Sequence, residues 1–138
     1  GLPLGIGAAL GSGAPTVVIQ GDGGLMLSIG ELAACAEHQI PVIICVFNDS
    51  GYGVLRIIQD SVYGHRHGTD LPKNDFVKIA EGMGVEAEHV RGIDEFEKAF
   101  ARAMLNPGPT LLDIDMSYLA PITFPLPAHQ RKKSDEHL

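Results

Sequence analysis

The sequence has no tryptophan, only two cysteines and no hydrophobic run long enough to cross a membrane. Cys35 and Cys45 lie in apolar segments and form no CxxC motif, which predicts two reduced core thiols rather than a disulfide or a zinc site. The 10 Lys and Arg residues are outnumbered by 17 Asp and Glu, giving a formal net charge of −7. This balance argues against nucleic acid as a partner. With no recognisable signal peptide, we expect a cytoplasmic protein that does not associate with membranes.

The chain is rich in glycine and aliphatic residues, with 17 glycines and 45% hydrophobic residues in 138. This length suits one domain with one core. We expect residues 1–116 to form that domain and residues 117–138, which carry three prolines and a charged end, to form an extended tail. The first residues, GLPLGIGAAL, suggest the middle of a longer polypeptide.

Apolar runs alternate with helical patterns along the domain. Helices are predicted over residues 1–11, 27–38, 54–59, 76–81 and 94–105, and strands over 16–20, 42–47, 85–90 and 110–116. Ser28 and Glu31 have the spacing of a capping box, and Asn74 or Asp75 is expected to cap the fourth helix. The pattern predicts a doubly wound α/β fold, with a mostly parallel sheet and helices on both faces.

Two glycine-rich acidic segments follow the first two strands: GDGG at residues 21–24 and NDSGYG at residues 48–53. Because ligands bind at the carboxyl ends of parallel strands, we expect both segments to lie over one site. Asp22 and Asp49 offer oxygen ligands, and the glycines allow backbone amides to approach an anion. This combination suits a diphosphate bound through Mg²⁺. A dinucleotide-binding fingerprint is a weaker alternative, because its third glycine would fall at Met26.

These motifs resemble the signature of the thiamine diphosphate-dependent enzymes of the 2-oxoacid decarboxylase and acetolactate synthase type. In that family Gly-Asp-Gly is followed, about two dozen residues later, by Asn-Asn or Asn-Asp. Here residues 24–47, which number 24, separate Gly23 from Asn48-Asp49. The resemblance extends from GLPLGIGAAL through DFVKIAEGMGV to GPTLLDIDM. It implies the domain that binds the diphosphate end of the cofactor.

The resemblance also implies the residues of the site. The expected Mg²⁺ ligands are the side chains of Asp22 and Asp49 and the carbonyl of Gly51, completed by two phosphate oxygens and a water. The family more often has Asn at the position of Asp49. Val54 and Ile58 match positions that line the substrate pocket, although both could equally be core residues. The full set of expected cofactor-binding residues is Gly21, Asp22, Gly23, Gly24, Asn48, Asp49, Gly51, Tyr52 and Gly53.

By the same resemblance, the parent enzyme would decarboxylate a 2-oxoacid or join it to a second carbonyl compound, as a homodimer or homotetramer. The glutamate that activates the cofactor belongs to a separate pyrimidine-binding domain of the same or another subunit, and nothing here matches that domain. We therefore expect no catalytic residue in this chain. On its own, the chain is expected to bind the diphosphate weakly or not at all and to show no turnover. Nothing in the sequence bears on FAD.

The type of enzyme is less determined. Biosynthetic acetolactate synthases carry Met and Trp shortly after the second loop, where this chain has Val54-Leu55-Arg56 and no tryptophan. This difference favours a decarboxylase of the benzoylformate type, or a related carboligase, over an acetolactate synthase. A non-catalytic module that kept the fold and a binder of another diphosphate, such as a nucleotide or phosphosugar, remain alternatives from other classes.

Two further features receive structural interpretations. Residues 59–74 are polar and are predicted to form a mobile surface loop; His65 and His67 could pair on a metal, but no third ligand stands at a useful spacing. Asp113 and Asp115 alternate with apolar residues on the last strand, so we expect them to share one face near a sheet edge. Both are outside the glycine-rich loops and are poor catalytic candidates.

Overall fold

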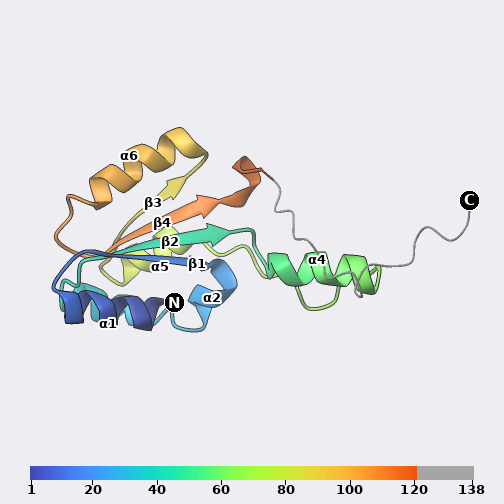
Figure 1. Cartoon of the computed structure of the whole chain (residues 1–138), viewed down its shortest axis with the longest axis horizontal. Helices are drawn as coiled ribbons and strands as arrows, with labels where there is room; N and C mark the ends of the chain where they lie inside the picture. The colour runs from blue at the N-terminus through green and yellow to red at the C-terminus, as the bar shows by residue number, and fades with distance from the viewer. Residues whose placement is uncertain (121–138) are drawn as a thin grey trace, which may run out of the picture.

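The structure, a computed structural model, describes residues 1–120 (Figure 1). Helices and strands alternate along the chain, as the sequence pattern predicts. The elements are α1 (Leu2–Ser12), β1 (Thr16–Gly21), α2 (Asp22–Met26), α3 (Glu31–Glu37), β2 (Val42–Asn48), α4 (Gly53–Val62), α5 (Phe76–Gly82), β3 (Glu86–Val90), α6 (Ile93–Ala103), β4 (Thr110–Asp115) and a 3-10 turn (Met116–Tyr118). The expected tail lies mostly in residues 121–138, outside the described residues.

The four strands form one sheet in the order β1-β2-β4-β3, and every neighbouring pair is parallel. The first five residues of β2, Val42 to Val46, are all buried. A continuous apolar strand of this kind is typical of the centre of a parallel sheet that is covered on both faces. Because all strands run the same way, their carboxyl ends, and the loops after them, lie along one edge of the molecule.

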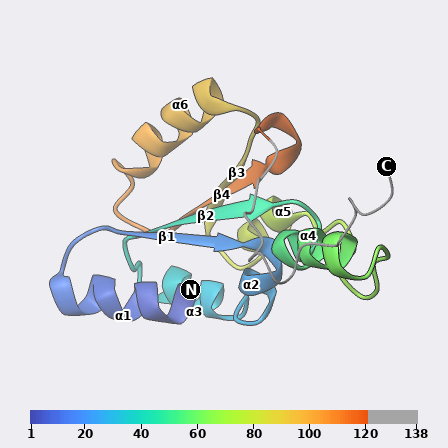
Figure 2. The same cartoon turned by 45° about the vertical axis from the view of Figure 1, so that its right-hand side comes forward.

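Helices cover both faces of the sheet, which confirms the doubly wound α/β fold. On one face Val42, Ile44 and Val46 of β2 pack with residues of α1, α3 and α5. On the other face Ile43 and Cys45 pack with residues of α6. Figure 2 shows α1 and α3 on one side of the sheet and α6 on the other. The two faces of β2 therefore belong to two separate core layers.

The two cysteines occupy these layers as free, buried thiols, as predicted. Burial raises the pKa of Cys45 to about 11, and burial with the nearby charge of Glu31 raises that of Cys35 to about 11. Both thiols are therefore protonated at neutral pH and lack the thiolate that reactive cysteines need. In the part of the chain that the structure describes, no helix is long and apolar enough to span a membrane.

The helix predicted over residues 27–38 is correct only in part, because α3 covers residues 31–37 and residues 27–30 are not helical. The chain instead turns into α2 directly at Asp22 and begins α3 only at Glu31, with Gly30 at its N-cap and no side-chain cap. Leu25 and Leu32 are both fully buried, whereas Leu27 between them is 86% exposed. The two buried leucines belong to separate helices, Leu25 to α2 and Leu32 to α3, and each packs in the core. Ser28 lies in the segment that connects α2 to α3. The capping box is consequently absent.

The expected edge position of the last strand is also wrong. β4 lies between β2 and β3, and the edge strands are β1 and β3. Asp113 of β4 is therefore buried, with 5% of its surface exposed. Asp113 and Asp115, the acidic residues that alternate with apolar ones in β4, line a cavity at the end of that strand. Their alternation does not indicate an exposed sheet edge. Asp75 caps α5 as expected, since its Oδ1 accepts a hydrogen bond from Lys78 N at 3.1 Å.

Close packing of α1 on β1 gives a prediction about stability. A Cβ at Gly5 would lie 2.1 Å from Cγ2 of Val18, a stiff and buried side chain, whereas a Cβ at Gly7 would meet nothing within 4 Å. We expect Gly5→Ala to lower the free energy of unfolding by about 1–3 kcal/mol through overpacking. The control, Gly7→Ala, is expected to raise it by roughly 0.5–1 kcal/mol because alanine favours the helix. Urea denaturation measures both; equal effects would refute this packing.

Candidate functional site

Asp22 connects the two glycine-rich loops. It follows β1 directly as the first residue of α2, and only 3% of its surface is exposed. Its Oδ2 accepts a hydrogen bond from the backbone N–H of Gly51 at 3.0 Å. Because β1 and β2 are paired up to Gly21 and Phe47, the segments that follow them emerge side by side. The expected meeting of the two loops is therefore present in the structure.

The two acids of these loops influence each other electrostatically. Burial is the main cause that raises the pKa of Asp22, and the charge of Asp49 raises it further. Hydrogen bonds from the amides of Gly23 and Gly51 act in the opposite sense. Two carboxylates that repel each other in a partly buried site favour the binding of a cation between them.

Arg56 of α4 braces the second loop. Its Nη1 donates to the carbonyl oxygen of Asp49 at 2.9 Å and its Nη2 to that of Ser50 at 2.6 Å, while Nε donates to Oδ1 of Asp70 at 2.7 Å. The Asp49 carboxylate also lies 3.5 Å from Nη1. Sequence reasoning missed this residue. The available signal was a lone arginine three residues after the loop, at the start of an amphipathic helix.

A segment beyond α4 holds the same loop from the other side. Tyr52 N donates to the carbonyl of Thr69 and Leu71 N to that of Ser50, both at 2.9 Å, and Gly51 forms an antiparallel bridge with Asp70. The prediction of a mobile loop across residues 59–74 is therefore wrong for residues 69–71, and also for residues 59–62, which lie in α4. Within the described residues, no three His, Cys, Asp or Glu side chains gather to hold a metal, so His65 and His67 gain no third ligand.

Three glycines are required by close contacts in this site. A Cβ at Gly23 would lie 2.5 Å from the Tyr52 ring, and one at Gly51 would lie 2.1 Å from Nη2 of Arg56. A Cβ at Gly53 would lie 2.2 Å from Oδ2 of Asp49. The glycines thus allow the two loops to pack against each other. Gly24 differs, because a Cβ there would meet nothing within 4 Å.

The side chain of Asn48 is used within the protein. Its Nδ2 donates to Oδ1 of Asp113 at 2.9 Å, and its Oδ1 accepts from Ser50 N at 3.1 Å. Val54 and Ile58 of α4 do not belong to the core, because that helix has no buried residue and Val54 is 43% exposed. The structure therefore leaves both available to line a pocket.

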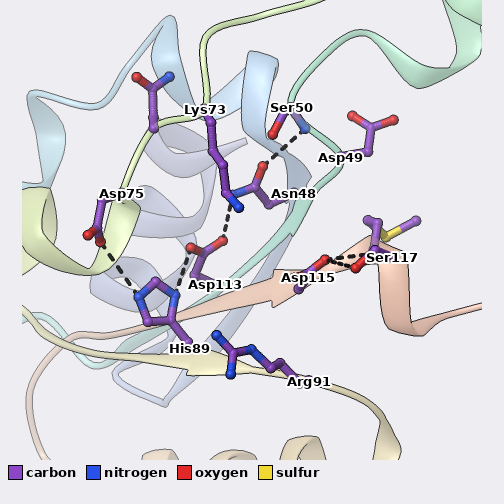
Figure 3. Close-up of a pocket in the computed structure, with 12 residues that line it drawn as sticks. Asn48, Asp49, Ser50, Lys73, Asp75, His89, Arg91, Asp113, Asp115 and Ser117 are labelled. Carbon is purple, nitrogen blue, oxygen red and sulfur yellow. Dashed lines mark hydrogen bonds and ion pairs between the residues drawn. The ribbon is translucent and has the colours of Figure 1, made fainter.

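A cavity of about 740 Å³ opens beside the second loop, where β2, β4 and β3 end (Figure 3). Asn48 and Asp113 face it, together with Asp75, His89 and Asp115. His89 Nδ1 lies 3.2 Å from Oδ2 of Asp113, and its Nε2 lies 3.6 Å from Oδ1 of Asp75. Burial raises the pKa of Asp113, and its bonds with Asn48 and His89 oppose that rise. The sequence had placed Asp113 outside the site.

Residues 1–114 match the family model described as "Thiamine pyrophosphate enzyme, C-terminal TPP binding domain". The chain belongs to the thiamine pyrophosphate enzyme family. This confirms the resemblance noted in the two loop motifs, and it places both loops within the matched region.

Individual thiamine pyrophosphate enzymes are similar over most of the chain. A probable acetolactate synthase large subunit of Methanocaldococcus jannaschii is 39% identical in an alignment of 119 residues that covers 83% of this chain and 20% of the relative. A 4-hydroxybenzoylformate decarboxylase of Rhodococcus jostii RHA1 is 36% identical with a TM-score of 0.79, over 83% of this chain and 22% of that one. Benzoylformate decarboxylase of Polynucleobacter necessarius is 26% identical with a TM-score of 0.76, over 88% and 24%. The chain thus spans about a fifth of such relatives.

The contact between Gly23 and Tyr52 gives a prediction with a matched control. We expect Gly23→Ala to displace the Tyr52 ring and lower the free energy of unfolding by about 1–3 kcal/mol. The amide of Gly51 should also exchange faster with solvent. Gly24→Ala should not lower stability, because nothing obstructs its methyl group and alanine favours the helix. Denaturation and amide hydrogen exchange measure both variants; a Gly23→Ala protein as stable and protected as the control would contradict the described contact.

Proposed function

We propose that Asp22, Asp49 and the carbonyl of Gly51 hold Mg²⁺ and, through it, the diphosphate of thiamine diphosphate. The observation that carries this proposal is the hydrogen bond from Gly51 N to Asp22, which brings two acidic loops together at one place. The donor set fits the ion, since Mg²⁺ prefers oxygen ligands and is usually bound by one or two carboxylates with phosphate oxygens. The mutual repulsion of Asp22 and Asp49 is what such a cation would neutralise.

The other residues of the two loops and of α4 would support the loop backbone or border the cofactor and the substrate. The backbone at Gly24 is open to an approaching anion, and Gly23 permits the close contact with Tyr52. Arg56 holds the carbonyl oxygens of Asp49 and Ser50 and so limits the positions of the loop. Val54 and Ile58, which project from α4 without entering the core, would border the substrate with aliphatic surface. The remaining expected cofactor-binding residues, Gly21, Asn48 and Gly53, support the backbone of these loops.

The parent enzyme would act on a 2-oxoacid by decarboxylation, carboligation or both. Bound thiamine diphosphate supplies the nucleophilic carbon and the electron sink for that chemistry. This chain would anchor the cofactor, and a pyrimidine-binding domain of the same or another subunit would contribute the activating glutamate in a homodimer or homotetramer. We therefore expect no 2-oxoacid turnover from these 138 residues alone. Steady-state turnover by the purified chain would contradict that division of roles.

The structural relatives named above act on benzoylformate or its 4-hydroxy derivative, and the curated relative is a probable acetolactate synthase. The Val54-Leu55-Arg56 segment, which replaces the Met and Trp expected of acetolactate synthases, favours a decarboxylase or related carboligase. A non-catalytic module remains the alternative from another class. It would show no magnesium-dependent heat when thiamine diphosphate is added.

Paired substitutions of the two acids test the metal assignment. Asp22→Asn is expected to weaken magnesium-dependent binding of thiamine diphosphate by at least about 100-fold. One oxygen of Asp22 already accepts from Gly51 N, and an amide has no second oxygen to offer the metal. Asp49→Asn is expected to retain binding, because the amide keeps an oxygen ligand. Calorimetry at millimolar cofactor, with and without Mg²⁺, measures both. Binding lost in Asp49→Asn with the fold intact, or kept in Asp22→Asn, would contradict the assignment.

Folding and binding can be separated in this experiment. Because the pKa of Asp22 is raised in the folded chain, the native state binds that proton more tightly than the unfolded chain does. The ionised carboxylate therefore lowers stability as the pH rises above the usual Asp range. Asn at this position carries no such cost, so we expect Asp22→Asn to fold at least as stably as the native chain at neutral pH. Loss of binding would then report the missing ligand.

A further inference from the structure

The orientation of the Asn48 amide depends on a residue far along the chain. Asn48 Nδ2 points to Oδ1 of Asp113 on β4, and Oδ1 of the amide points to the backbone N–H of Ser50 (Figure 3). An ionised carboxylate can only accept hydrogen bonds. Its presence at position 113 therefore requires the NH₂ group of Asn48 to face β4. The amide oxygen is then left facing the loop, where it accepts from Ser50.

Asp113 is well suited to set this orientation. It is 5% exposed and lies on β4, a strand paired on both sides. Its second oxygen, Oδ2, is 3.2 Å from Nδ1 of His89 on the edge strand. With one oxygen engaged by Asn48 and the other by His89, the carboxylate has little freedom to rotate.

The orientation of the Asn48 amide affects the backbone of the acidic loop through Ser50. Ser50 has a φ of 55°, a left-handed conformation that side chains other than those of Gly, Asn and Asp adopt infrequently. The bond from Ser50 N to Asn48 Oδ1 supports that conformation, which turns the chain so that the next amide, Gly51 N, meets Asp22. A series of contacts thus runs from Asp113 through Asn48 and Ser50 to Gly51 and Asp22.

We propose that Asp113 is a positioning residue for the metal–diphosphate site, acting through the Asn48 amide on the loop that presents Asp49 and Gly51. This inference rests on the proposed function for its effect on cofactor binding. Its structural part, the hold of Asp113 on the Ser50–Gly51 turn, does not. Asp115, two residues further on, supplies a matched control. It faces the same cavity, but its Oδ1 bonds to Ser117 N and Oγ instead of to Asn48.

The test compares three variants of the full 138-residue chain: Asp113→Asn, Asp115→Asn, and the double variant Asn48→Asp with Asp113→Asn. In the first, the amide at position 113 can either accept from Asn48 or donate to it, so the partner on β4 no longer fixes the orientation of the Asn48 amide. The double variant exchanges donor and acceptor. The new carboxylate at position 48 can accept from both Ser50 N and the new amide at position 113, and the net charge is unchanged.

Two measurements are made on each folded variant. Hydrogen exchange of the Ser50 and Gly51 amides, followed by NMR without any ligand, reports the turn. An NMR titration with thiamine diphosphate and Mg²⁺, which reaches millimolar dissociation constants, reports binding. Asp113→Asn should accelerate exchange at both amides and weaken binding about tenfold, the scale of one hydrogen bond to a charged group. Asp115→Asn should change neither, and the double variant should restore slow exchange at both amides.

Other outcomes have distinct meanings. Unchanged exchange at Ser50 and Gly51 in Asp113→Asn would overturn the inference, as would equal effects of Asp115→Asn or failure of the exchanged pair to restore the turn. If the native chain alone bound no thiamine diphosphate, because the pyrimidine-binding domain is missing, the exchange data would still decide the role of Asp113 in the loop. If Asp113→Asn did not fold, the same comparison would be made with Asn48→Asp alone, which opposes two carboxylates and should also accelerate exchange.

Discussion

The hydrogen bond between Gly51 N–H and the Asp22 carboxylate is the contact on which the site depends. It joins the turn after β1 to the turn after β2 and holds a nearly buried acid close to a second acid. Burial of a carboxylate is unfavourable unless hydrogen bonds or a cation compensate for it. Here backbone amides compensate in part, while Asp49 adds repulsion. A divalent cation bound there would offset the charge of the buried Asp22 carboxylate.

The surrounding structure limits how the loops can respond to that repulsion. Arg56 binds two carbonyl oxygens of the second loop, and residues 69–71 pair with its backbone. Glycines at the contact points allow a spacing that any side chain would prevent. Asp113 of β4 also supports this loop, because it accepts a hydrogen bond from Asn48, whose amide oxygen binds Ser50 N. The loop is thus held by α4, by the segment after it and by β4, each from a different part of the chain.

The spacing of the GDGG and NDSGYG segments between apolar runs was enough to predict a parallel α/β fold and a site shared by two loops, because parallel strands bring their carboxyl ends together. It was not enough to predict the supports of that site. Arg56, the bridge at Asp70 and the bond from Asn48 to Asp113 depend on tertiary placement, and the last depends on β4 lying next to β2 rather than at an edge. The order of strands in a sheet produces no periodic pattern in the sequence, so it could not be predicted from the spacing of apolar residues. The break between α2 and α3 was likewise decided by which leucines reach the core.

The account is tested most directly by locating the cation. Mn²⁺ added to the chain with thiamine diphosphate broadens NMR signals according to their distance from the ion, and this can be followed on the backbone amides. The account predicts the strongest broadening at Asp22, Asp49 and Gly51. Broadening centred instead on Asp75, Asp113 and Asp115, which line the cavity beside Asp49, would contradict it.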